Sequence, residues 1–127
     1  MACPPLPHRM MSLFKIEYST FGKAGSEYIK IEDRTLSYVK NQQDTITRKL
    51  RKKHYSQLHE LFKEISLDSL ETLKIPTKRH QADAALAATL LVTDINSKEY
   101  LSPTFDDDNP PQKIKALITY IKELANK

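Results

Sequence analysis

The chain has 127 residues, of which 39% are hydrophobic and 28% charged, and its formal net charge is +4. This length fits one domain whose core needs no disulfide or metal to support it. Two glycines and one cysteine leave no glycine-rich phosphate-binding loop and no intramolecular disulfide. The positive charge is concentrated in residues 1–65, which is a mild polarity and not a basic nucleic-acid arm.

Residues 1–12 contain three of the seven prolines and show no hydrophobic periodicity. We therefore predict a flexible leader, followed by a single domain over residues 13–127. No run reaches the roughly 18 apolar residues that span a membrane. The first residues also lack the apolar middle of a signal peptide, so this start, taken literally, indicates a cytoplasmic protein.

Alternating apolar and polar residues predict four strands in the first half of the domain. Phe14, Ile16 and Tyr18 alternate with charged residues, as in a half-buried strand. The weakest of the four carries Ile46 and Leu50 on one face. The four strands are expected at residues 13–19, 28–32, 35–40 and 44–51, with turns at 22–25 and 33–34.

Apolar residues at helical spacing then predict a helix over residues 53–65. A short helical turn capped by Asp68 follows it and ends before Pro76. The helix is expected to bury one stripe, formed by Leu58, Leu61, Phe62 and Ile65.

The apolar run at residues 85–95 fits a central strand, because it is short and mixes small with β-branched residues. A helix over Asp83–Val92 is the alternative that this run leaves open. A hairpin turn at Asn96–Ser97 leads into a strand at residues 99–105, which Pro103 makes an edge or bulged strand.

The last predicted element is a helix over residues 111–127. The order of strands, helix, hairpin and helix predicts an α+β fold, in which an antiparallel sheet of five or six strands carries two main helices packed on one face. The apolar stripe of the last helix consists of Ile114, Leu117, Ile118, Ile121 and Leu124. Both helical stripes are expected to bury against Phe14, Ile16, Leu90 and Val92.

The segment FDDDNPP, residues 105–111, has two interpretations. Its carboxylates suit a cation, but a calcium loop usually adds a glycine for the turn and a later bidentate glutamate. Helix initiation explains more of the segment, since Asp108 or Asn109 can cap the first turn. Pro110 or Pro111 then fits the first helical position. We expect the start of a helix and no metal site.

The loops at residues 77–83 and 104–109 enter and leave the predicted hairpin, so both are expected at the end opposite its turn. Either an Arg79–aspartate contact ties the last helix to the sheet there, or a small polar pocket binds an ion or a partner's charged group. The residues that this arrangement would gather are Lys78, Arg79, His80, Asp83, Asp106, Asp107 and Asn109.

The basic run at residues 48–53 consists of Arg48, Lys49, Arg51, Lys52 and Lys53. Such a cluster can neutralise phosphates or bind an acidic surface. No aromatic platform of the kind that binds single strands accompanies it, and lysines also protect a solvated edge strand. We expect the solvated edge, and nucleic-acid or acidic-surface binding is the alternative.

The sequence points to no catalytic residue, metal or cofactor. His54 and His59 are five residues apart and face different sides of a helix, whereas two ligands on one helix need a spacing of four. Cys3 has no nearby base that would activate it. A carboxylate pair of Asp83 and Asp106 is the remaining route to acid–base catalysis.

Three stretches carry a resemblance to a known group of proteins: FKIEYS, LETLKIPTKRHQADAALAATLLV and SPTFDDDNPPQKIKALITYI. From Phe14 to Leu124 the chain resembles small uncharacterised proteins of Bacteroidetes-type bacteria that are predicted to be lipoproteins. In that group an Arg and an Asp precede the small-residue strand, matching Arg79 and Asp83. A Phe-Asp and an Asn-Pro-Pro lead into the last helix, matching Phe105, Asp106, Asn109, Pro110 and Pro111.

The resemblance implies the fold and the cell envelope, and no reaction. The chain departs from the group at Ala84, where a glycine is usual, and it is written without the apolar signal peptide and lipid-attachment cysteine. The location is cytoplasmic if the start is literal, and the envelope if a signal segment precedes it.

Together these patterns favour a non-enzymatic binding or interaction domain at the bacterial envelope. An exposed sheet edge offers its backbone groups to a partner strand, so a protein partner is expected. Nucleic-acid binding through the basic run at residues 48–53 is the alternative.

Overall fold

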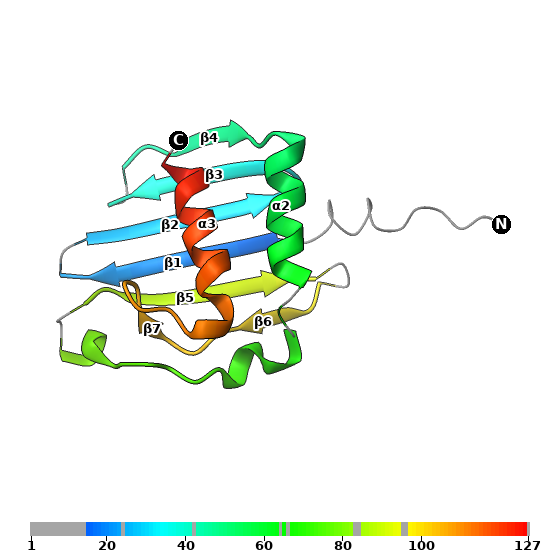
Figure 1. The fold of residues 1–127 in the computed structure, drawn as a ribbon. Helices are drawn as coiled ribbons and strands as arrows, with labels where there is room; N and C mark the ends of the chain where they lie inside the picture. The colour runs from blue at the N-terminus through cyan, green and yellow to red at the C-terminus, as the bar shows by residue number, and fades with distance from the viewer. Residues whose placement is uncertain are drawn as a thin grey trace.

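A computed structural model of the chain describes residues 15–23, 25–41, 43–63, 65, 67–82, 85–94 and 97–126. They form an antiparallel sheet with two α-helices on one face, which confirms the predicted α+β fold (Figure 1). The strands are β1 (Lys15–Gly22), β2 (Gly25–Glu32), β3 (Thr35–Lys40), β4 (Ile46–Lys49), β5 (Ala87–Thr93), β6 (Glu99–Leu101) and β7 (Phe105–Asp106). The α-helices are α2 (Lys52–Lys63) and α3 (Lys115–Ala125), and the 3-10 helices are η1 (Leu67–Thr72), η2 (Arg79–Ala82) and η3 (Gln112–Ile114).

The strand order across the sheet is β4-β3-β2-β1-β5-β6, with β7 also paired to β5. Strands β1 to β4 follow one another as hairpins, and β5 then returns beside β1. The predicted turn between β2 and β3 lies at Asp33 and Arg34, which both have positive φ, at 52° and 65°. Two consecutive residues of this kind match the twist of the flanking strands.

Alternating residues of β1 and β5 bury the sheet face that lies beneath the helices. Ile16 lies opposite Val92 and Tyr18 opposite Leu90, and all four side chains are buried. The run at residues 87–93 is therefore the predicted strand and not the alternative helix, because β1 on one side and β6 on the other pair with it. Phe14, the remaining predicted core partner, lies outside the described residues.

The two α-helices present their predicted stripes to this face. In α2, Leu58 is fully buried, and Leu61, Phe62 and Ile65 (the last just beyond the helix) pack half-buried against the core. The whole predicted stripe of the last helix is buried, from Ile114 in η3 to Leu124 near the end of α3. The spacing of apolar residues alone thus identified the packed face of both helices.

The strand predicted at residues 99–105 is interrupted by a bulge, which accounts for the seventh strand. Leu101 lies opposite Leu91 and Phe105 opposite Ala88, so three residues, 102–104, face only two residues of β5. Ser102 holds the bulge against β5. Its N–H donates to the Leu90 carbonyl at 2.9 Å, and its Oγ accepts the Leu90 N–H at 2.9 Å. Pro103 has no N–H to lose at this point, so the predicted bulged strand is confirmed.

The chain between α2 and β5 runs along the β6–β7 edge of the sheet (Figure 1). Within it, η1 contacts β6 and η2 contacts β7. The predicted short helical turn is η1, and the side chain of its expected cap, Asp68, lies outside the described part of the chain. This segment covers one edge of the sheet and brings polar residues onto β7.

The opposite edge of the sheet is β4, and no other strand in the described ranges pairs with its outer side. The strand is shorter than predicted, ending at Lys49, and Leu50 is buried just beyond it. Ile46, expected to pack on the same face, is 52% exposed because it lies at the corner of an edge strand.

Candidate functional site

Asp106 is a fully buried carboxylate at the point where β7 meets η2. Its Oδ1 accepts hydrogen bonds from the His80 N–H at 2.7 Å and from His80 Nδ1 at 2.7 Å. Its Oδ2 accepts the Arg79 N–H at 3.1 Å and the Thr77 hydroxyl. Arg79 Nε adds an ion pair at 3.4 Å. A carboxylate has about four lone-pair sites, so every acceptor site of Asp106 already faces a donor.

This arrangement caps η2 from a distant part of the chain. The first amides of a helix have no partner within the helix, and here they belong to Arg79 and His80. Both donate to Asp106, which lies 27 and 26 residues further along the sequence. Asp106 therefore fixes η2 against β7 and closes the covered edge of the sheet.

The hydrogen bonds also determine the charge of Asp106. Burial alone raises the pKa of a carboxyl group, but the hydrogen bonds from the Thr77 hydroxyl, the His80 ring and the amides of His80 and Arg79 outweigh burial. Their combined effect holds the pKa of Asp106 well below its usual range. Asp106 is therefore ionised at neutral pH, and His80 Nδ1 must carry the proton that it shares with Oδ1.

Further interactions, on the solvent side of Asp106, connect the same two loops, residues 77–83 and 104–109. Arg79 pairs with Asp108, and the two side chains are 45% and 59% exposed. The Asn109 N–H donates to the Asp106 carbonyl at 3.0 Å, and Asn109 Nδ2 donates to Thr77 Oγ1 at 3.2 Å. The prediction that these loops meet is confirmed. Lys78 is exposed beside the contact, and Asp83 lies outside the described residues.

Asp107, the residue after β7, belongs to a different contact. Its N–H continues the pairing of β7 by donating to the Leu86 carbonyl at 2.9 Å, and successive residues of an extended chain point to opposite faces. The Asp107 side chain accepts a hydrogen bond from the Tyr18 hydroxyl and an ion pair from Lys122 Nζ at 2.8 Å. Lys122 also donates to the Asp107 carbonyl at 3.1 Å and lies 5.7 Å from the Tyr18 ring centroid. Burial and the hydrogen bond to Asp107 raise the pKa of Tyr18. This contact, more than Arg79, ties α3 to the sheet.

The predicted role of FDDDNPP as a side-chain cap of the last helix is wrong. No side chain caps η3, which begins after Pro111, or α3, which begins after Ile114. The carboxylates of this segment have other partners: Asp106 accepts from the amides of η2, Asp107 pairs with Lys122, and Asp108 pairs with Arg79. Pro111 lies at the N-cap of η3, one residue before the first helical position where it was expected.

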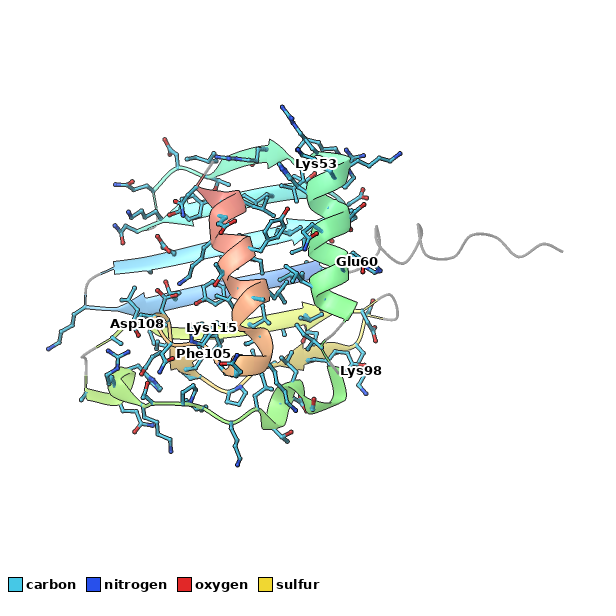
Figure 2. The ribbon with its side chains drawn as sticks, viewed as in Figure 1. Lys53, Glu60, Lys98, Phe105, Asp108 and Lys115 are labelled. Atoms are coloured by element: carbon cyan, nitrogen blue, oxygen red, sulfur yellow. The ribbon has the colours of Figure 1, made fainter. Side chains whose placement is uncertain are left out.

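The exposed members of the basic run form a second candidate site, which we name the cationic corner: Lys49, Arg51, Lys52 and Lys53. They lie where β4 ends and α2 begins, and side chains at this end of α2, near Lys53, extend away from the fold (Figure 2). Arg48 differs from them in its exposure and its partner. It is half-buried and donates to the Leu124 carbonyl at the end of α3, at 3.3 Å.

The cationic corner is not neutralised by ion pairs within the described part of the chain. None of its four residues forms an ion pair there, and the first turn of α2 contains no acidic residue. The amino end of a helix carries a positive partial charge, so these cations raise the local potential further. A cleft of about 300 Å³ lies in the corner, lined by Arg48, Lys49, Leu50, Arg51, His54 and Leu124.

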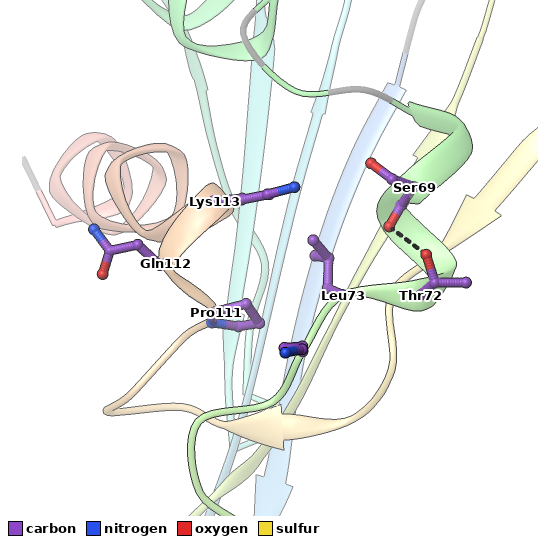
Figure 3. Close-up of a pocket in the computed structure, with 7 residues that line it drawn as sticks. Ser69, Thr72, Leu73, Pro111, Gln112 and Lys113 are labelled. Atoms are coloured by element: carbon purple, nitrogen blue, oxygen red, sulfur yellow. Dashed lines mark hydrogen bonds between the residues drawn. The ribbon is translucent and has the colours of Figure 1, made fainter.

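A larger pocket of about 430 Å³ separates η1 from η3 (Figure 3). Its walls come from two segments about forty residues apart, and no motif in either segment indicates a pocket. The Thr72 hydroxyl donates to the Ser69 carbonyl beside this pocket, at 3.2 Å (Figure 3). The lining residues are Ser69, Thr72, Leu73, Lys74, Pro111, Gln112 and Lys113. None of them is a buried charged group that would orient a ligand.

Metal ligands do not gather in the described ranges: no group of three or more His, Cys, Asp or Glu is arranged to hold an ion there. No helix in the same ranges is long and apolar enough to cross a membrane. No protein-family model, curated protein or solved structure matches this chain.

Proposed function

We propose that this protein is a non-enzymatic interaction domain that binds an acidic protein partner through the cationic corner. One observation carries the proposal: four exposed cations gather at the positive end of α2, and none of them forms an ion pair within the described residues. Such a cluster is unfavourable for the isolated fold, because like charges repel one another and the helix dipole. An acidic partner relieves both effects on binding.

The state of Asp106 supports a non-enzymatic role. A general base needs a free lone pair and a pKa close to the working pH. Asp106 has its acceptor sites occupied by Thr77, Arg79 and His80, and its pKa is held low. The cluster predicted from the sequence thus supports the fold in our proposal, and binding takes place elsewhere.

The position of Arg48 favours an acidic protein over nucleic acid. Of the five cations in the basic run, Arg48 is half-buried and already donates to the Leu124 carbonyl at the end of α3, so fewer of its donors are left for a phosphate on the outer surface. The remaining four form a compact group, suited to a short acidic segment. The bacterial envelope is the compartment implied by the lipoprotein resemblance, and we propose that the partner is met there.

The test compares two doubly substituted proteins that lose the same charge. The first is Lys52→Glu with Lys53→Glu, in the corner, and the second is Lys74→Glu with Lys115→Glu. Figure 2 shows that Lys115 lies far along the fold from Lys53. Fluorescence anisotropy with labelled polyglutamate should show binding that weakens with salt, since Debye screening shortens to about 8 Å at physiological ionic strength.

We expect the corner variant to lose about tenfold in affinity and the distant variant to remain near wild type. Equal losses in both would show that only net charge matters and would overturn the proposal. Labelled DNA and RNA serve as competitors, and tighter binding of either than of polyglutamate would assign the corner to nucleic acid. Crosslinked capture from the native host then identifies the partner, and its capture must fail with the corner variant.

A further inference from the structure

The two edges of the sheet differ in what covers them. Along β6 and β7, the segment with η1 and η2 lies against the edge, held by the bonds that Asp106 accepts. Along β4, no element in the described part of the chain pairs with the outer side. Of the two edges in the described part of the chain, β4 is therefore the one that is available to another strand.

The hydrogen-bond register identifies which backbone groups face outward on β4. The Leu50 N–H donates to the Arg34 carbonyl at 2.7 Å. Since paired residues of antiparallel strands alternate between bonded and non-bonded pairs, Arg48 and Ile46 also direct their backbone groups to β3. Thr47 and Lys49 then direct their N–H and C=O groups away from the sheet.

The surroundings of this edge favour an acidic strand. Thr47 and Lys49 are exposed, and the cleft of about 300 Å³ at the end of the edge is lined by Lys49 and Arg51. The rest of the cationic corner follows immediately in the chain. Ile46, which is 52% exposed, adds an apolar contact at the other end of β4.

Two other occupants fit less well. A second copy pairing β4 with β4 would place side by side two strands that each carry Arg48 and Lys49 and no acidic residue, and like charges on adjacent strands are destabilising. The first fourteen residues of this chain carry no acidic side chain, so they do not complement the corner either.

We infer that an extended acidic segment of the protein partner adds to the sheet as a strand along β4, pairing with the outward backbone groups of Thr47 and Lys49. This inference rests on the proposed function, because it uses the same cationic corner. It specifies the backbone conformation of the bound segment and the main-chain bonds that hold it, as in other cases of strand addition.

The decisive variant is Thr47→Pro, with Thr47→Val as its matched control. Proline removes an outward N–H that β3 does not use, and edge strands tolerate it at such a position. The probe is a short labelled peptide in which Glu and Thr alternate, measured by anisotropy at low salt. A second probe alternates Glu with Pro, which keeps the charge but adopts an extended polyproline helix without half of the amide donors.

We expect Thr47→Val to bind the Glu-Thr peptide like wild type and Thr47→Pro to lose about tenfold, as for one lost hydrogen bond. The Glu-Pro peptide should bind more weakly than the Glu-Thr peptide. Hydrogen exchange of the wild-type protein is the independent measurement: the peptide should protect the amides of Thr47 and Lys49 and leave that of Arg48 unchanged. This result does not depend on how well any variant folds.

Two results would overturn strand addition while leaving the proposed function intact. One is that both peptides bind the wild-type protein with equal affinity and that neither binds the Lys52→Glu, Lys53→Glu variant. The other is binding with no added protection at Thr47 and Lys49. If neither peptide nor polyglutamate binds at low salt, the cationic corner itself is refuted, and strand addition with it.

Discussion

At the scale of single residues, Asp106 shows how one buried charge can organise two distant loops. Desolvation opposes the ionised form, and four hydrogen bonds together with an ion pair to Arg79 overcome it. A satisfied buried carboxylate is stable, but its donors lose their partner when the charge is removed. The neighbouring pair of Arg79 with Asp108 is exposed and has no such dependence.

The first prediction contrasts these two aspartates. Asp106→Asn should lower the free energy of unfolding by on the order of 3 kcal/mol, because the amide replaces an acceptor with a donor facing other donors. Asp108→Asn should cost less than about 1 kcal/mol. Urea unfolding monitored by circular dichroism measures both. Similar losses in the two variants would contradict the central role of Asp106.

The low pKa of Asp106 adds a pH dependence to the same comparison. The unfolded chain protonates this carboxyl near pH 3.9, whereas the folded protein does so only at a much lower pH. Between these two values the unfolded state binds more protons, so stability is complete above about pH 4 and falls as the pH is lowered. The difference in urea midpoint between wild type and Asp106→Asn should therefore be smaller at about pH 3 than at about pH 5. A constant gap would contradict the assigned charge.

At the scale of elements, the bulge between β6 and β7 decides where FDDDNPP is placed. Without the extra residue at 102–104, the register of β7 against β5 would shift by one and exchange the faces of Asp106 and Asp107. The bulge is held by Ser102, which is buried, and its Oγ accepts the Leu90 amide while donating to the Pro103 carbonyl at 3.0 Å.

The prediction at this scale is that Ser102→Ala destabilises the protein by about 1–3 kcal/mol, the cost of leaving the buried Leu90 amide without an acceptor. Hydrogen exchange should accelerate at Leu90 in particular. Thr104→Ala, in the same bulge, is the control and should remain within about 0.5 kcal/mol of wild type. Unchanged protection of Leu90 would show that the backbone adjusts to replace the hydroxyl.

At the scale of the whole molecule, the two sheet edges are protected by different means. The β6–β7 edge is covered by the segment with η1 and η2, whereas the β4 edge is short and flanked by cations. Charges on an edge strand discourage indiscriminate pairing, and we propose that the same charges select an acidic partner. In our proposal, the cationic corner lowers the stability of the isolated fold, and the same residues bind the partner.

This link gives the last prediction. Lys52→Glu and Lys53→Glu, tested singly, should each raise the free energy of unfolding by roughly 0.3–1 kcal/mol, because an acid replaces a base in the first turn of α2. Lys74→Glu, away from any α-helix terminus, should change it by less than about 0.5 kcal/mol. Thermal unfolding measures all three. Destabilised corner variants would mean that these lysines support the fold.

Local patterns were sufficient for most of the elements and for the faces that β1 and both α-helices bury. Apolar residues recur every three or four positions in α3 and every second position in β1, so Leu117 and Ile16 could be assigned to the core before any contact was known. Pro103 predicted the bulge for a similar reason, since a missing N–H is a property of the residue itself. Such features depend on neighbours within a few positions in the chain.

The candidate sites depend on partners that no local pattern specifies. The hairpin topology predicted an Arg79–aspartate contact, and that contact is confirmed, but it did not predict that Asp106 also accepts the Thr77 hydroxyl and the amides of Arg79 and His80, or that Asp107 meets Tyr18 across 89 residues. Likewise, Arg48 differs from the rest of the basic run because the Leu124 carbonyl at the end of α3 accepts a hydrogen bond from it. A polar side chain takes whichever donor or acceptor the folded chain brings within about 3 Å, and strand register and chain path decide which one that is.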